Sequence, residues 1–191
     1  MHRRLRINRG LFIFALACLF IFGANLFVSC APKKSDEEKI LDAFNGYLKT
    51  QGTGNFEDSY NYLAPQTKKE ISRRDWVIKQ LEGVNVIKLM RDPRLVNIVV
   101  KGNTATADFY YRGMPPGIVA KVMTYIYSRD LFTPPSDIYR ETEKYLLEHF
   151  DEVAAPQRKV VSFIRTRGKW GIMIDASGKL YGISGQKPPA P

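Results

Sequence analysis

The first thirty residues decide where the folded part of this chain begins. Four arginines and no acidic residue lie among the first nine positions, an almost wholly apolar run extends from Leu11 to Val28, and a serine then precedes Cys30. A basic head, an apolar middle and a small-residue exit are the three parts of a secretory signal. The pattern predicts that residues 1–29 are removed and that the remaining 162 residues form one domain of ordinary size outside the cytoplasm.

The residues around Cys30 resemble the bacterial lipobox, in which a large apolar residue, a small or β-branched residue and a small residue precede the cysteine. Val28 and Ser29 fit the positions nearest the cut, and Phe27 takes the place of the usual leucine. The resemblance implies that Cys30 is the lipid attachment site and carries a diacylglyceryl thioether and an acylated amine. Each buried acyl methylene contributes about 0.8 kcal/mol, so several chains together give stable anchoring. We therefore expect a lipid-anchored protein of the bacterial cell envelope, with residues 30–35 as a lipidated tether.

Two other interpretations of this segment stay open. The apolar run is close to the lower limit of roughly 17 to 25 residues for a spanning helix, so an uncleaved signal anchor is physically reasonable. The other is a soluble protein with a chance cysteine. The lipoprotein and the signal anchor both place the body of the chain outside the cytoplasm, and neither distinguishes an inner from an outer membrane.

The mature chain has no cysteine left for disulfides or thiolate chemistry, since Cys18 lies within the signal and Cys30 is expected to be modified. Its stability must therefore come from packing. A single histidine, His149, cannot build the usual zinc site, and the phosphate-binding pattern G-x-x-x-x-G-K-[ST] is absent from the sequence. We expect neither a metal nor a cofactor.

The mature chain is moderately basic, with 25 Lys and Arg against 19 Asp and Glu, a net charge of +6. Such an excess favours anionic lipid headgroups or cell-wall polymers through long-range attraction that salt screens. A solvated surface explains it equally well. Nucleic acid is not expected as a partner, because the compartment is wrong and the sequence patterns of common nucleic-acid modules are absent.

The first half of the mature chain has the pattern of helices. Ser35 and Glu38 form a capping box, and apolar residues then follow at helical spacing up to the glycines at 52 and 54. A second short helix is expected from Asn55 until Pro65 breaks it. Ser72 begins a third, with Trp76 on its apolar face.

From Val84 the apolar period changes toward two, which indicates a sheet with one buried face. The fold class predicted is α+β, with N-terminal helices packed on a curved antiparallel sheet of about five strands. A helical insertion is expected between strands three and four. The expected strands are Val84–Arg91, Leu95–Lys101, Thr104–Arg112, Val160–Thr166 and Trp170–Asp175. In the third strand an inner row shares the core side of Phe109, and in the last strand Trp170, Ile172 and Ile174 form the clearest buried row; the inner row is Ala105, Ala107, Phe109 and Tyr111.

The insertion, residues 113–157, is longer than the roughly 12 to 15 residues of an ordinary connection and contains two helical patterns. Pro115-Pro116 and Pro134-Pro135 precede them. We interpret it as a lid or flap on the sheet, or as extra core that covers an open face. The single domain is expected over residues 36–180, with a flexible tail at 181–191.

Four stretches carry a resemblance to a known fold: Asn55–Leu63, Ser72–Trp76, Thr104–Phe109 and Gly168–Ile172. With the order of elements they resemble the nuclear-transport-factor-two-like superfamily, and more narrowly small bacterial lipoproteins that carry such a domain, over about residues 36–176. The resemblance implies a cone in which a curved sheet wraps around a long helix. Its members include enzymes, ligand binders and dimerisation modules, so it implies no single activity.

A catalytic alternative centres on His149, because an imidazole paired with a carboxylate moves protons near neutral pH. Helical spacing places His149 beside apolar neighbours, and Asp108 alternates away from Phe109, so we expect a binding module more than an enzyme. Candidate partners are carboxylates at Asp108, Glu148 and Asp175, and hydroxyl donors at Tyr111 and Tyr110.

Candidate ligand contacts are Arg165, with Arg167 two residues on, for an anion, and Tyr110 for stacking. Ordinary surface charge and routine packing are the favoured explanations of these residues. Three functions are therefore weighed. The first is a non-enzymatic envelope module that binds a protein or small ligand near the membrane. The second is a small-molecule enzyme that uses His149. The third is a structural subunit that forms a homodimer.

Overall fold

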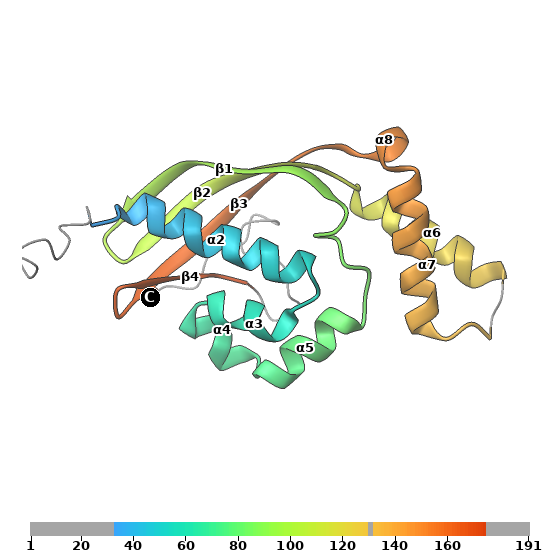
Figure 1. Cartoon of the computed structure of the whole chain (residues 1–191), viewed down its shortest axis with the longest axis horizontal. Helices are drawn as coiled ribbons and strands as arrows, with labels where there is room; N and C mark the ends of the chain where they lie inside the picture. Colours follow the sequence, from blue (N-terminus) through green and yellow to red (C-terminus); the bar gives the residue numbers. More distant parts are fainter. Residues whose placement is uncertain (1–32, 130–131, 175–191) are drawn as a thin grey trace, which may run out of the picture. The chain divides into compact units, whose positions relative to one another are not determined.

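The computed structural model describes residues 33–129 and 132–174. The chain divides into two units, Met1–Lys34 and Ser35–Pro191, and the helices and strands given below all belong to the second unit (Figure 1). The predicted signal peptide, Cys30, Asp175 and the predicted tail at 181–191 lie outside the described residues.

Five short helical segments follow Ser35, and the predicted capping box is confirmed. The Ser35 hydroxyl accepts from the Glu38 amide at 3.1 Å, and the Glu38 carboxylate accepts from the Ser35 amide at 2.7 Å. The expected break at Pro65 is also the start of a further helix, because proline fits the first helical turn. The segments are α2 (Asp36–Gly52), α3 (Phe56–Ser59), the 3-10 helix η1 (Tyr60–Tyr62), α4 (Pro65–Glu70) and α5 (Arg73–Leu81).

The sheet is antiparallel, as predicted, but has four strands in the described part of the chain instead of five. The strands lie in the order β1 (Met90–Lys101), β2 (Thr104–Gly113), β3 (Ala155–Thr166) and β4 (Lys169–Ile172). The helical insertion therefore lies between strands two and three, and the last strand ends earlier than the predicted Asp175.

The predicted strand Val84–Arg91 is wrong except for its last two residues, and Asp92-Pro93 does not end a strand. Asp92 and Asn97 take positive φ values of 51° and 52° at two irregularities within β1, so β1 continues through them as a bulged strand. Before it, the chain is turned by Asn85, which donates from its side chain to the Gln51 carbonyl at 2.9 Å and from its amide to Glu143 at 2.8 Å.

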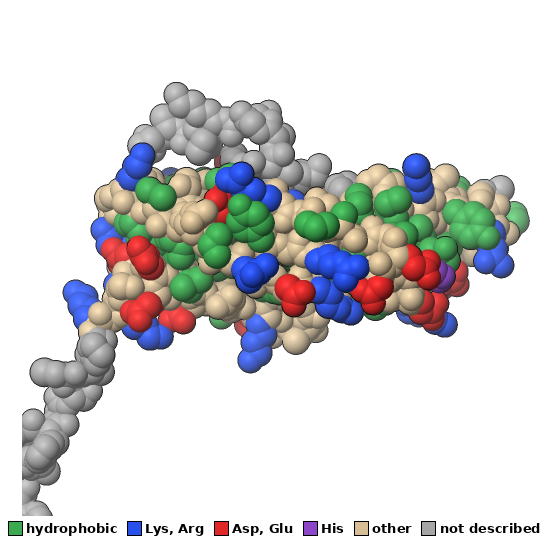
Figure 2. Space-filling view, turned by 90° about the horizontal axis from the view of Figure 1, so that it is seen from above, with side chains coloured by type: hydrophobic (Ala, Val, Ile, Leu, Met, Phe, Trp, Pro, Cys, Tyr) green, Lys and Arg blue, Asp and Glu red, His purple; other side chains and the backbone are tan. Residues whose placement is uncertain are grey.

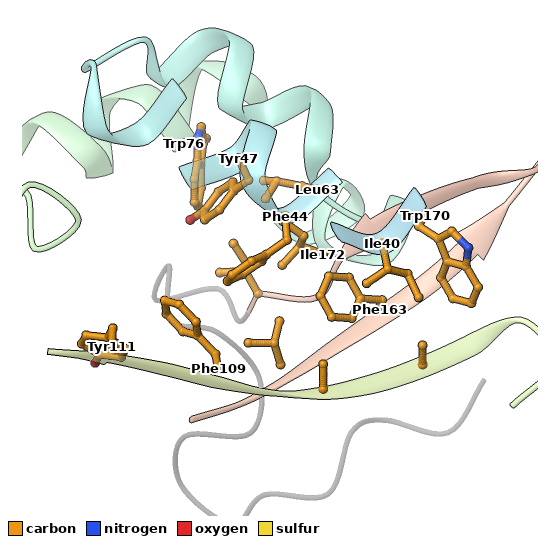
Figure 3. Packing of buried hydrophobic residues seen from close by; sticks show 14 of the residues in the cluster. Ile40, Phe44, Tyr47, Leu63, Trp76, Phe109, Tyr111, Phe163, Trp170 and Ile172 are labelled. Atoms are coloured by element: carbon orange, nitrogen blue, oxygen red, sulfur yellow. The ribbon is translucent and has the colours of Figure 1, made fainter. Parts of the chain in front are cut away.

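The main core lies between α2 and one face of the sheet, and Figure 3 shows aromatic side chains from both meeting there. Phe44 of α2 meets Phe109 edge-on with ring centroids 4.9 Å apart, and Phe163 at 6.1 Å. The predicted inner row of β2 is confirmed as buried, and so is the predicted row of Trp170, Ile172 and Ile174. The interior of the predicted cone is thus filled by side chains.

The insertion forms α6 (Pro116–Arg129), α7 (Pro135–Glu148) and the short α8 (Phe150–Val153). We call α6 and α7 the helical pair. Leu146 of α7 forms a second buried cluster with Leu89, Met114 and Phe150, and apolar residues of α6 pack against it. None of the residues described in this pair belongs to the main core. The pair is attached where Gly113 pairs with Ala155, at one end of β2 and β3.

No helix within residues 33–129 and 132–174 has the length and apolar character needed to cross a membrane.

The close approach of β4 to the start of α4 gives a stability prediction. A side chain at Gly171 would place its Cβ 2.7 Å from the Ala64 Cα, and the Ala64 amide donates to the Ile172 carbonyl at 2.8 Å. Gly171→Ala should therefore lower the free energy of unfolding by about 1–3 kcal/mol through overpacking against backbone. The urea midpoint of the purified chain measures it.

Gly117→Ala is the matched control, because an added Cβ there meets no atom within 4 Å. It should be neutral or slightly stabilising, since alanine favours helix. Equal midpoints for Gly171→Ala and Gly117→Ala would contradict the close approach.

Candidate functional site

Asp36, in the first turn of α2, joins three parts of the chain. Its carboxylate accepts from Arg165 at 2.7 Å, from Lys39 at 3.1 Å and from the Trp170 indole nitrogen at 3.4 Å. Arg165 also donates to Gly102 and Asn103 in the turn between β1 and β2, at 3.1 Å each. We call Asp36, Lys39, Arg165 and Trp170 the Asp36 clasp. It holds the start of α2 beside both hairpin turns.

The clasp lowers the pKa of Asp36 below its usual 3.8. The hydrogen bond from Lys39 is the largest cause, burial opposes it, and Trp170 and the charge of Arg165 add to the lowering. Each contact favours the ionised carboxylate.

Two adjoining hollows beside the clasp share Asn61, Lys169 and Trp170, with volumes of about 430 and 510 Å³. Together they form an open groove between the β3–β4 hairpin on one side and α2 with the segment from η1 to α4 on the other. Four cations line the two hollows and Asp42 is the acid among the lining residues, so the groove suits an anion. We define the basic groove by Lys39, Asn61, Lys68, Arg167, Lys169 and Trp170.

Side-chain contacts hold one wall of the basic groove in place. Lys68 donates to the Asn61 carbonyl at 3.1 Å, and Arg73 donates to the Asn61 side chain at 2.9 Å. Both cations lie 5.4 Å from the centre of the Tyr60 ring. Burial lowers the pKa of Lys68, and the nearby charge of Arg73 lowers it further. Two cations are thus held together, and a bound anion would offset their repulsion.

The opposite wall is a two-residue hairpin turn. Arg167 and Gly168 both have positive φ, 50° and 78°, between the paired residues Thr166 and Lys169. Such turns favour Asn-Gly, because most side chains disfavour the left-handed region by about 1–2 kcal/mol. In this chain an arginine occupies the strained position beside the groove. Strained residues often occur at functional sites.

The candidate catalytic residues are not brought together by the contacts described. Nδ1 of His149 lies 2.9 Å from the Tyr145 carbonyl, and its ring stacks on Tyr145 at 4.2 Å; a carbonyl only accepts, so Nδ1 donates. Asp108 lies on the outer face of β2, whereas Tyr111 is buried on the inner face and stacks on Phe109.

Asp108 is engaged by other partners on the outer face. It accepts from Asn97 and from Arg158, each at 2.9 Å, and the Asn97 hydrogen bond followed by Arg158 lowers its pKa. Tyr110 lies on the same face with Arg158 5.8 Å from its ring centre. The face seen in Figure 2 shows Lys and Arg interspersed with Asp and Glu. This differs from the basic groove, where cations predominate.

The candidate anion ligands differ in their roles. Arg165 belongs to the Asp36 clasp, while Arg167 lines the basic groove. The sequence analysis does not identify Lys39, Asn61, Lys68 or Lys169. The only local signal is the run Arg167-Gly168-Lys169, which places two cations at a predicted strand connection. No cluster of three or more side chains suited to hold a metal occurs within the described ranges.

No protein-family model matches the chain, and no curated protein matches its sequence. Among solved structures, the chain is similar to a SEC-C motif containing protein from Rhodopseudomonas palustris, with 11% identity and a TM-score of 0.34. The match covers 65% of this chain and 66% of that one, just under two thirds of its length.

The lowered pKa of Asp36 predicts a pH dependence. Ionised Asp36 stabilises the fold, so this contribution is complete well above pH 3.8 and is lost as pH falls through the lowered folded pKa. Asp36→Asn should therefore lower the urea midpoint near neutral pH, and the difference from wild type should shrink below about pH 4.

Glu37→Gln controls for the loss of one negative charge in the same helical turn, since Glu37 is exposed. If Asp36→Asn and Glu37→Gln gave the same pH profile, the clasp would have no specific role.

Proposed function

We propose that this chain is a lipid-anchored protein of the bacterial envelope whose domain binds an anionic ligand in the basic groove without catalysing a reaction. The observation that carries the binding proposal is the gathering of Lys39, Lys68, Arg167 and Lys169 around one open groove, against Asp42 as the acid of its lining. Coulomb attraction to this cluster favours a ligand with negative charge.

The anchor half of the proposal rests on the sequence around Cys30. A basic head, an apolar run and the lipobox-like Phe27-Val28-Ser29 precede this cysteine. Within the described residues the first helix begins at Asp36, six positions after the cysteine. A short tether followed at once by a folded domain suits a protein held against a membrane. We further propose that the domain is nuclear-transport-factor-two-like, and the helix α2 packed on one face of an antiparallel sheet supports this.

The homodimer remains a second candidate, supported by exposed aromatic residues on and beside the helical pair. Tyr125 is 58%, Tyr127 50% and Phe132 96% exposed, and a surface of this kind suits protein contact. The helical pair lies at the other end of the sheet from the β1–β2 turn. Dimerisation through this surface is therefore compatible with ligand binding in the basic groove. Catalysis by His149 has no comparable support.

The anchor is tested by feeding radiolabelled fatty acid to cells that express the chain. Wild type should take up label and Cys30→Ala should take up none, because the thiol that forms the thioether is gone. Cys18→Ala is the matched control and should label like wild type. Label on Cys30→Ala would mean that lipid is attached elsewhere, and the assignment would fail.

The binding half is tested with tripolyphosphate as a soluble anionic probe and the detergent-solubilised full chain. Lys68→Gln with Lys169→Gln should weaken calorimetric affinity by about tenfold or more, since each charge-assisted contact contributes about 1.5–3 kcal/mol. Lys49→Gln with Lys144→Gln removes the same charge from exposed positions outside the groove and should change affinity far less. Equal losses of affinity in the two double variants would mean that the net charge of the protein, and not the groove, determines binding.

A further inference from the structure

The basic groove lies at the end of the domain where the described fold begins. Lys39 and Trp170 belong both to the Asp36 clasp and to the groove. Asp36 follows the capping residue Ser35 directly. The groove is therefore next to the point at which the chain enters the domain, and this position is fixed by contacts within the domain.

The length of chain before that point limits how far the groove can lie from a lipid anchor. Five Cα steps join Cys30 to Ser35, and an extended chain spans at most about 3.3–3.6 Å per residue, or roughly 17 Å in all. The headgroup layer adds about 5–7 Å on each side of the hydrocarbon core. A domain anchored through Cys30 thus keeps its groove end at the headgroup layer or just above it.

We propose, building on the proposed lipid anchor, that the ligand of the basic groove is the phosphate of an anionic phospholipid in the leaflet that holds the acyl chains of Cys30. The groove chemistry suits this ligand. Lys68 and Lys169 act as compact charges, and the guanidinium of Arg167 matches two phosphate oxygens. Tyr62, which also lines the groove and is half-buried, is a residue type enriched at headgroup level.

The open form of the groove agrees with a tethered ligand. A site held next to its ligand by a short linker works at millimolar effective concentration, so weak binding suffices for high occupancy. A deep enclosed pocket is unnecessary under those conditions. Each basic residue near an anionic surface changes affinity by about fivefold, and several such residues face this groove.

The proposal fixes the orientation of the domain on the membrane. β2 runs from Thr104, near the clasp, to Gly113, where the helical pair begins. Ten strand residues span roughly 34 Å. With the groove on the headgroups, the helical pair and its exposed aromatic residues are directed away from the lipid, where they are open to protein partners.

The test is photo-crosslinking of the full-length, lipidated chain in vesicles that contain photoactivatable phosphatidylglycerol. Crosslinks should map to the segment from η1 to α4 and to the β3–β4 hairpin. The triple variant Lys68→Gln, Arg167→Gln, Lys169→Gln should lose well over tenfold of the yield, since about fivefold per cation multiplies to roughly a hundredfold in affinity. The control triple Lys49→Gln, Arg74→Gln, Lys144→Gln changes exposed positions outside the groove and should keep most of it.

Equal yields for the two triple variants, or crosslinks concentrated on the helical pair, would overturn the proposal. Added inorganic phosphate should compete poorly, because the tethered lipid is present at high local concentration. If phosphate at millimolar concentration abolished crosslinking, the ligand would be free phosphate and not the lipid. The proposal of an anion site in the groove would then hold, and the proposal of a phospholipid ligand would not. A chain without fatty-acid label would instead refute the anchor, and this inference with it.

Arg167→Asn separates binding from folding. Asparagine tolerates positive φ, so this variant should keep or raise the thermal midpoint while it lowers the crosslink yield about fivefold. A lower thermal midpoint together with unchanged crosslinking would show that Arg167 stabilises the turn and does not bind the ligand, which would contradict its role in the groove.

Discussion

One carboxylate, that of Asp36, fixes the geometry on which the candidate site depends. Through Arg165 and Trp170 it holds the start of α2 against the β3–β4 hairpin, and Arg165 extends the contact to the β1–β2 turn. Partly exposed ion pairs contribute little to stability on average. The consequence of this one is positional, because it places the basic groove beside the entry of the chain into the domain.

The aromatic core explains why the site lies on the surface. Phe44, Phe109 and Phe163 fill the space between α2 and the sheet, so a ligand there would have to displace close-packed side chains. The candidate groove lies instead at the rim, where the Arg167-Gly168 turn and α4 leave an open hollow. Binding at a rim suits a large or surface-bound partner better than a small molecule that must be enclosed.

Local patterns could be predicted from the sequence, because each depends on residues close together in the chain. The Ser35–Glu38 capping box, the inner row of β2 and the helices of the insertion are examples. The strand predicted over residues 84–91 is wrong because its alternating apolar residues lie in turns and in a second cluster around Leu89. The basic groove could not be predicted from the sequence, because Lys39, Lys68 and Lys169 are far apart along the chain and come together only in the folded domain.

We propose that the clasp end of the domain, with its basic groove, faces the membrane that holds the anchor. Nuclear relaxation of the lipidated chain in nanodiscs with a spin label on the lipid headgroups tests this orientation. The strongest broadening is expected for the amides of Gly168 and Lys169 and the weakest for α6 and α7. Uniform broadening, or a gradient that is strongest on the helical pair, would contradict it.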